Sequence, residues 1–359
     1  MSPLRADLLE EFTCTNESGA VHVAIDVPIG LRVKGPSEAT PPRQSGSVRR
    51  TSTIDMRWPD GWGKQLRLTG RARDLLTPAD GGQPIVLAED QLDVGVAPDR
   101  TIQEISANPP RSAVAGLVGL RGGSGSRGRI AELLASEKEA GTPLYLLLDD
   151  IPGATLIAGF AFSSWMSPEM RLELMEKNGS LPKRRMEGVC TGFQPGSSGL
   201  TPDGSSRFTH QVKPVQPLDR TDDPEGWHPL NDIAEISMRR ARLIDVHLDE
   251  VVTIDSMFQD SSTTPDGGRI AVHEYRVEAT ADPLTGELLT LHADPRVLPY
   301  NECPLASANV GRLVGTPLRD LRSVVLEQLP GTEGCTHLND AMRALAEVPV
   351  MVESLRQLD

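Results

Sequence analysis

The sequence predicts an α+β protein, built as a tandem duplication of an antiparallel β-meander followed by helices, with a degenerate first copy. Three observations predict this fold class: two segments share motifs in the same order, each begins with strand-like alternation, and each ends with apolar residues at helical spacing. The length of 359 residues also exceeds what one hydrophobic core usually serves, so two units are expected from size alone.

The duplication is recognised by motifs that return in the same order. Arg49-Arg-Thr-Ser-Thr-Ile-Asp55 returns as Arg239-Arg-Ala-Arg-Leu-Ile-Asp245, an offset of 190 residues (239 − 49). Gly141-Thr and Asp150 match Gly331-Thr and Asp340 at the same offset, and between them Leu117-Val-Gly119 matches Leu313-Val-Gly315. These matches indicate repeated units at 49–165 and 239–350. The predicted order is therefore an N-terminal arm and linker (1–48), a degenerate first repeat (49–165), a linker excursion (166–238) and the second repeat with its C-terminal end (239–359).

Within the second unit, β-branched residues alternate with polar ones at 243–248, 251–257, 269–279 and 287–292, which predicts four strands. Helices are predicted at 305–314, 318–329 and 338–348, the second of them after the N-cap and Pro pair Thr316-Pro317. The first unit follows the same order, with a helix at 130–139. Its glycine-rich insert at 121–128 lacks the Gly-Lys-Ser/Thr ending of a phosphate-binding loop, so we interpret it as a flexible surface loop.

The segments outside the two units are interpreted as connections. Residues 1–48 contain a short helical start at 4–12 and a strand-like run at 21–27, and residues 166–238 contain a helix candidate at 168–177 before a polar Pro/Gly/Ser-rich run. That run is predicted to be too polar to bury and to pass over the surface. Cys190, His210 and His228 lie in it without partners at metal-ligand spacing, so no functional role is predicted for them.

Composition excludes several classes of function. A formal charge of −14, without a run of basic residues interleaved with aromatics, argues against nucleic-acid binding. The N-terminus lacks an apolar signal region and no window approaches the length of a membrane span, so a cytoplasmic protein without membrane association is expected. Four cysteines are too sparse for a disulfide scaffold, which fits a reducing compartment. No dinucleotide fingerprint or Ser-His-Asp order is evident, so no nucleotide cofactor is expected.

Four residues of the second unit are the candidate site: His273, Cys303, Cys335 and His337. Cys335-Thr-His337 stands where a glycine-bounded loop enters a predicted helix, and Cys303 precedes another. Thiolates and imidazoles together suit zinc or iron, and a helix N-terminus favours a thiolate because its unpaired N–H groups carry partial positive charge. Cys303, Cys335 and His337 are equally the candidate catalytic residues if the site is metal-free.

The first unit provides an internal comparison for these four residues. By alignment, Cys335 corresponds to Tyr145, His337 to Leu147, Cys303 to about Ala107 and His273 to about Ala88. All four are absent together, which favours a single site in the second unit and a scaffold role for the first. Each residue also has an ordinary structural interpretation: a buried thiol for Cys303, a helix-start residue for His337, and a strand histidine for His273.

The motifs of the second unit resemble a known family. His273-Glu, Asp282, Pro299-Tyr-x-x-Cys303, Leu313-Val-Gly315 and Gly334-Cys-Thr-His-Leu338 resemble the bacterial domain-of-unknown-function family numbered 2889, over about residues 239–350. That resemblance implies no activity. The first unit departs from the pattern at every His and Cys.

A more distant similarity is to NifU/IscU-type iron-sulfur scaffold proteins and SufE-like domains, which share the order of strands, a Cys opening a helix, and a late Cys/His pair. It implies a NifU/SufE-like fold with Cys303, Cys335 and His337 at ligand positions. The scaffold's earlier Cys is absent near Asp266–Gly268, so Asp266 or His273 would complete a zinc site.

Three functions remain open on the sequence alone. The first is a protein with a Cys/His zinc or iron site, which is a Lewis-acid enzyme with three protein ligands and a structural or carrier site with four. The second is a metal-free cysteine enzyme acting on a small molecule. The third is a binding or assembly module without catalysis, in which the first unit supplies a surface for a protein partner.

Overall fold

The computed structural model describes residues 14–15, 21–22, 25, 27–123, 125–167, 169–170, 173, 185–207 and 210–357. The predicted helical start at 4–12 lies outside this range, and so does most of the helix candidate at 168–177. The strands are β1 Cys14–Thr15, β2 Val21–His22, β3 Ser47–Arg57, β4 Leu66–Thr77, β5 Ile85–Val96, β6 Ile102–Asn108, β7 Lys213–Val215, β8 Ser237–Leu248, β9 Val252–Thr263, β10 Arg269–Ala281 and β11 Leu288–Val297. The α-helices are α1 Ser126–Leu133, α2 Ala135–Glu139, α3 Pro143–Ile157, α5 Leu321–Gln328, α6 Thr336–Ala344 and α7 Val348–Arg356, and shorter 3₁₀ segments join them.

One large antiparallel sheet organises the described residues. Its strand order is β11-β10-β9-β8-β3-β4-β5-β6, and β7 adds to β10. Each unit predicted from the sequence contributes four consecutive strands, followed by helices. The prediction of an α+β protein with antiparallel strands before helices is therefore confirmed at this level.

The two sets of four strands meet at β3 and β8, which pair in antiparallel register from Ser47 opposite His247 to Arg57 opposite Ser237. Arg49 on β3 forms an ion pair with Asp245 on β8, and Arg239 on β8 forms one with Asp55 on β3. The two halves thus share one continuous sheet, joined by backbone hydrogen bonds and by reciprocal buried ion pairs.

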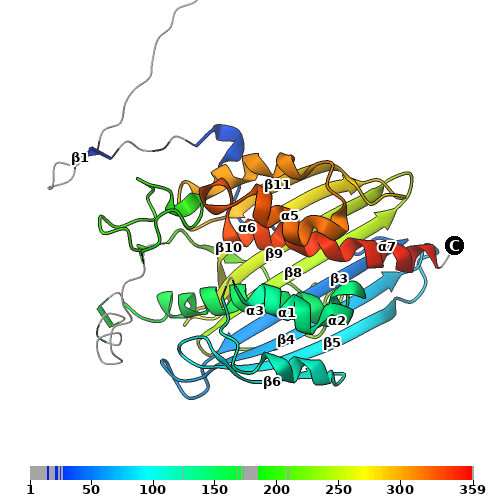
Figure 1. The fold of residues 1–359 in the computed structure, drawn as a ribbon, viewed down its shortest axis with the longest axis horizontal. Helices are drawn as coiled ribbons and strands as arrows, with labels where there is room; N and C mark the ends of the chain where they lie inside the picture. The colour runs from blue at the N-terminus through cyan, green and yellow to red at the C-terminus, as the bar shows by residue number, and fades with distance from the viewer. Residues whose placement is uncertain are drawn as a thin grey trace, which may run out of the picture.

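Helices cover one face of this sheet. Figure 1 shows α1, α3, α5, α6 and α7 lying across it, with α3 over β3, β4 and β5 and α6 over β9 and β10. α3 begins at Pro143, and the Thr142 Oγ1 accepts a hydrogen bond from the backbone N–H of Tyr145, as expected of an N-cap. The expectation that no window approaches the length of a membrane span is wrong for Pro143–Ser163, which is apolar and long enough to cross a membrane, but 83% of its apolar window is buried inside the molecule. This burial is what the core helix of a globular protein shows.

Part of the linker excursion packs on the other face of the sheet, which differs from the prediction that this segment is too polar to bury. Leu218 and Trp227 pack on Ala241, Leu243 and Met257 of β8 and β9. His228 is also buried, and its two ring nitrogens bond to Thr51 and Thr53 of β3. Leu218 and Trp227 of the excursion are thus placed on the sheet.

The helices of the second unit are more broken than predicted. The segment expected as a helix at 305–314 is a 3₁₀ segment, Cys303–Leu313. The expected helix at 318–329 divides into a 3₁₀ turn and α5, and that at 338–348 divides into α6, a 3₁₀ turn and the start of α7. In the first unit, the helix expected at 130–139 divides into α1 and α2. Short turns keep the apolar spacing of a helix, so periodicity alone does not reveal these breaks.

Candidate functional site

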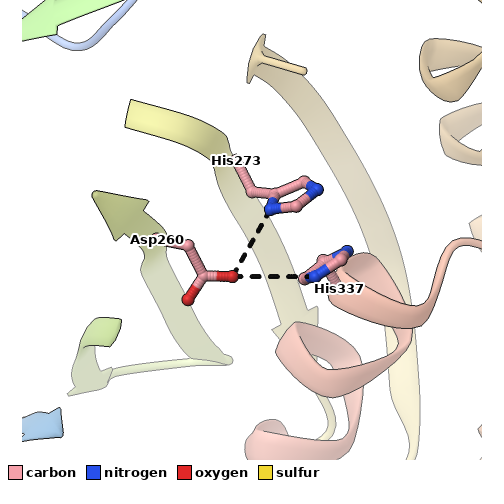
Figure 2. A group of neighbouring side chains, drawn as sticks. All are labelled: Asp260, His273 and His337. Atoms are coloured by element: carbon pink, nitrogen blue, oxygen red, sulfur yellow. Dashed lines mark ion pairs between the residues drawn. The ribbon is translucent and has the colours of Figure 1, made fainter. Parts of the chain in front are cut away.

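Three side chains from separate elements converge beneath the helical layer. Asp260 comes from β9, His273 from β10 and His337 from α6 (Figure 2). The Asp260 Oδ2 lies 3.5 Å from the Nδ1 of His273 and 3.7 Å from the Nε2 of His337. One ligand atom from each residue lies within 4.8 Å of the other two, and the described residues contain no other group of three or more such His, Cys, Asp or Glu atoms.

A β-bulge sets the direction of His273. In the β9–β10 ladder, Ala271 lies opposite Ser261 and His273 lies opposite Asp260, so Val272 is an extra residue. In a regular strand, Ala271 and His273 would project from the same face. The bulge breaks this alternation and places His273 beside Asp260, a common use of bulges near sites.

The first turn of α6 places His337. Cys335 is the N-cap of α6, and His337 is the second residue of the helix. The imidazole ring of His337 stacks on that of His273 with 3.4 Å between the ring centroids and an interplanar angle of 18°. The Nδ1 of His337 lies 3.3 Å from the hydroxyl of Thr336. The remaining nitrogen, Nε2, is therefore the one that faces Asp260 (Figure 2).

Both imidazoles are held neutral. Burial lowers the pKa of His273, and burial together with the neighbouring His273 lowers the pKa of His337 well below its usual value. Burial alone would raise the pKa of Asp260, but the charge of Arg240 outweighs it and holds that pKa below the usual range. The His273 Nδ1 and His337 Nε2 are buried and have no hydrogen-bond partner. Two unpaired nitrogens therefore face one ionised carboxylate.

Arg240 on β8 fixes this carboxylate. Its Nε and Nη2 donate to the two oxygens of Asp260 at 2.9 and 3.0 Å, and its Nη1 reaches Asp340 at 3.1 Å and Asp150 at 3.4 Å. Arg242 forms a second pair with Asp150, and Arg127 forms one with Asp340. Three arginines thus balance three aspartates in a largely buried network that joins β8 and β9 to α1, α3 and α6.

The three buried cysteines form a cluster that is separate from the triad. The sulfurs of Cys303 and Cys190 lie 2.6 and 4.0 Å from the position that a Cβ would take at Gly192, so a side chain there would collide with the Cys303 sulfur. Cys190, Cys303 and Cys335 are all free and buried. Burial raises the pKa of Cys190 to about 12, that of Cys303 well above its ordinary value, and that of Cys335 as well. The three groups are therefore neutral thiols.

A cavity of about 1080 Å³ connects these groups. His273, His337 and all three buried cysteines line it. The first half of the chain also lines it, through the glycine-rich segment around Gly122 and the part of α3 around Leu156. The segment interpreted from the sequence as a surface loop therefore borders the cavity, and residues of both halves enclose it.

The sequence-predicted residues thus all line one cavity but divide into two groups. His273 and His337 come together with Asp260, whereas Cys303 and Cys335 lie with Cys190 and are not part of the triad. Asp260 was missed because it lies in a strand without a local motif, and only its register opposite His273 reveals it. Cys190 stands alone in the linker sequence. No sequence signal placed it beside Cys303.

Two imidazoles and one carboxylate are a donor set that zinc and iron ions use in proteins, so the triad is a candidate group of metal ligands. Zinc binds His nitrogen and carboxylate oxygen at about 2.0–2.2 Å, so two ligand atoms of a tetrahedral site are about 3.3–3.5 Å apart. The two distances to Asp260 Oδ2, 3.5 and 3.7 Å, are close to this spacing. Two histidines and one carboxylate are also a donor set of non-haem iron sites.

Residues 238–351 match a family model described as protein of unknown function (DUF2889), so the predicted resemblance of the second half to that family is confirmed. A comparison with curated proteins finds no match, and neither does a comparison with solved structures. The predicted similarity to NifU/IscU-type scaffolds and SufE-like domains stays a prediction.

Proposed function

We propose that this protein binds a zinc or iron ion through Asp260, His273 and His337, and that the ion acts on a small molecule held in the adjoining cavity. The observation that carries this proposal is the pair of buried, unpartnered imidazole nitrogens facing one carboxylate oxygen. A buried polar atom without a partner costs free energy, about 1–3 kcal/mol. A metal ion would satisfy both nitrogens once the stacked rings turned to direct their in-plane lone pairs at it.

The electrostatics support ligation at this position. Histidine binds a metal only in its neutral form, and the lowered pKa values of His273 and His337 keep both neutral. The Oδ2 of Asp260 accepts a hydrogen bond from Arg240 and retains a second lone pair, because each oxygen of an ionised carboxylate has two acceptor sites. Arg240 would then orient the carboxylate from behind, as outer partners of metal ligands commonly do.

Three protein ligands favour an enzyme over a structural metal site. Structural zinc sites are closed by four protein ligands, whereas catalytic sites keep a position open. A metal ion at such a site supplies a Lewis acid that polarises a carbonyl or phosphoryl oxygen or lowers the pKa of a water molecule. His273 and His337 line the cavity, so the open position would face its contents.

The cysteines have a different role in this proposal. Cys303 and Cys335 were predicted as ligands, but they lie with Cys190 as neutral thiols that shape the cavity wall. The alternative of a metal-free cysteine enzyme is less favoured for the same reason, since the thiolate is the nucleophile and burial raises the pKa of all three thiols. The binding-module alternative does not explain the unpartnered nitrogens.

We also propose that the two halves arose by duplication and that the first has lost its site. Arg50 and Asp74 pair on β3 and β4 as Arg240 and Asp260 pair on β8 and β9. Ala88 lies opposite Asp74, next to a bulge, where His273 lies opposite Asp260. The first half would thus retain the ion pair of the site without its imidazoles.

The test is metal binding by protein purified without a His-tag and stripped with a chelator. Calorimetric titration with Zn²⁺, and with Fe²⁺ under anaerobic conditions, is expected to show one site per chain. The variants His273→Ala, His337→Ala and Asp260→Asn are each expected to weaken that site at least about tenfold, as loss of a ligand does.

The first half provides a matched control for this experiment. Asp74→Asn changes another buried, arginine-paired aspartate in the neighbouring strand pair and is expected to leave metal binding intact. Cys303→Ser and Cys335→Ser are expected to retain it too. Absence of binding in both the Zn²⁺ and the Fe²⁺ titration would overturn the proposal. Loss of binding only in the cysteine variants would place the metal site at the thiols instead.

A further inference from the structure

The cavity carries an excess of positive charge within an acidic protein. Of its described lining residues, Arg100, Arg121 and Arg127 are cationic and Asp340 alone is acidic. Asp340 is already paired with Arg127 and Arg240. The whole chain, by contrast, has a formal charge of −14. An excess of arginine in a concave site on such a protein favours an anionic ligand.

The glycine-rich segment holds Arg121 at the cavity edge. The backbone of Arg121 forms an isolated antiparallel β-bridge with Thr101, and the Arg121 Nε donates a hydrogen bond to the Asp99 carbonyl at 2.9 Å. The backbone N–H of Gly122 donates to the Arg100 carbonyl at 2.7 Å. A Cβ at Gly122 would lie 3.1 Å from the Thr155 hydroxyl oxygen on α3, so the segment packs closely on that helix. Arg121 is therefore an exposed cation on a fixed backbone, and its charge also acts on the exposed carboxylate of Asp99.

The remainder of the cavity wall is largely apolar. Leu156 of α3 is 46% exposed and Leu326 of α5 is 48% exposed, and both line the cavity. Val189, Phe193 and Phe160 line it as well. Large apolar side chains that face a cavity rather than the core indicate a ligand with an apolar body.

We propose that the cavity binds a small organic anion with an apolar body, whose carboxylate lies at the Arg121 side and whose apolar part lies against Leu156 and Leu326. This inference rests on the proposed function in that it names the class of molecule brought to the metal ligands. Its own content, recognition of the anion by Arg121, is measurable without metal.

The experiment compares decanoate with decanol, which has a similar apolar body and no charge, by calorimetric titration of chelator-treated protein. Decanoate is expected to bind about tenfold more tightly or better, since a charged hydrogen bond contributes about 1.5–3 kcal/mol. Arg121→Gln is expected to remove this preference and leave decanol binding unchanged. Leu156→Ser is expected to weaken both.

Arg67→Gln serves as the control, because Arg67 is a partly exposed arginine on β4 that does not line the cavity. It is expected to leave the preference for decanoate intact. Equal binding of the two probes, or an unchanged preference in Arg121→Gln, overturns the inference. If the preference is present but no metal binds, the proposed metal function fails alone. If metal binds and the two probes do not differ, this inference fails alone.

Discussion

At the scale of single residues, buried histidines differ by whether their nitrogens are satisfied. Those of His228 accept from or donate to Thr51 and Thr53 at 2.9 and 2.8 Å. The inward-facing nitrogens of His273 and His337 have no such partner. All three rings have a lowered pKa, with burial as the largest cause. The pairing of ring nitrogens, and not burial or pKa, therefore separates a structural histidine from a candidate ligand.

His228 gives a pH prediction that is independent of metal. Burial, with Arg73 and Arg239 nearby, lowers the pKa of His228 from 6.5 to about 3. The folded state keeps the ring neutral between these values while the unfolded state takes a proton, so stability falls as pH decreases from about 6.5 towards 3. Protonation of His228 in the unfolded state is expected to lower the free energy of unfolding by about 2 kcal/mol at pH 5 relative to pH 7.5.

Urea unfolding at the two pH values measures this difference. His228→Gln, which keeps a donor and an acceptor for the two threonines, is expected to lose about 2 kcal/mol less than the parent protein when the pH is lowered. An equal loss in both proteins would contradict a neutral, buried His228.

At the scale of elements, the central strands carry charges where an apolar core would be expected. Arg50 of β3 and Arg240 of β8 are each 1% exposed, and each pairs with an aspartate on the adjacent strand. Because β8 begins with polar residues, alternation predicted a strand only at 243–248, whereas it starts at Ser237. Charged side chains inside a sheet hide the strand from hydrophobic patterning, since their partners lie on other elements.

The same reason limits what the sequence reveals of the site. His337 and Cys335 could be predicted because they stand at a helix start, where local sequence sets the geometry. Asp260 becomes a neighbour of His273 only through strand register and a bulge, which depend on contacts far along the chain. The strand-then-helix order was predictable from local periodicity, but the joining of both halves into one sheet was not.

The Arg240–Asp260 pair gives a prediction about stability. Arg240→Met leaves the buried Asp260 without its cation and is expected to lower the free energy of unfolding by about 3–5 kcal/mol. In the double variant Arg240→Met/Asp260→Leu, the other two carboxylates keep cations, Asp150 with Arg242 and Asp340 with Arg127. The double variant is therefore expected to regain at least about half of the loss, because no charge is left unpaired.

Denaturant unfolding of the single and double variants measures the effect. The Arg50–Asp74 ion pair of the first half gives the same comparison. Arg50→Met is expected to lower the free energy of unfolding, and Arg50→Met/Asp74→Leu is expected to regain part of that loss, because Glu347, the other partner of Arg50, keeps Arg322 as its cation. A double variant less stable than its single variant would contradict the explanation by an unpaired buried charge.

At the scale of the whole molecule, the two halves complete each other. β3 and β8 pair over their length, and Arg49 with Asp245 and Arg239 with Asp55 cross between them. On the helical face, Asp150 of α3 reaches Arg240 and Arg242 of β8. The cavity also takes its walls from both halves. The first half, although it lacks the imidazoles, is therefore part of the core of the second and of the proposed site.

This dependence predicts that the second half does not fold alone. Residues 234–359 would expose the long edge of β8 and leave Arg239, Arg242 and Asp245 without their partners from the first half. An exposed strand edge promotes aggregation, and each unpaired buried charge costs several kcal/mol.

Produced alone, this fragment is expected to be insoluble or unfolded by circular dichroism. Produced with residues 1–233, it is expected to form a soluble one-to-one complex on size exclusion, with Zn²⁺ binding restored. A monomeric fragment 234–359 that unfolds cooperatively would show instead that the shared sheet is not needed for the second half to fold, and its own Zn²⁺ affinity would then measure what the first half adds to the site.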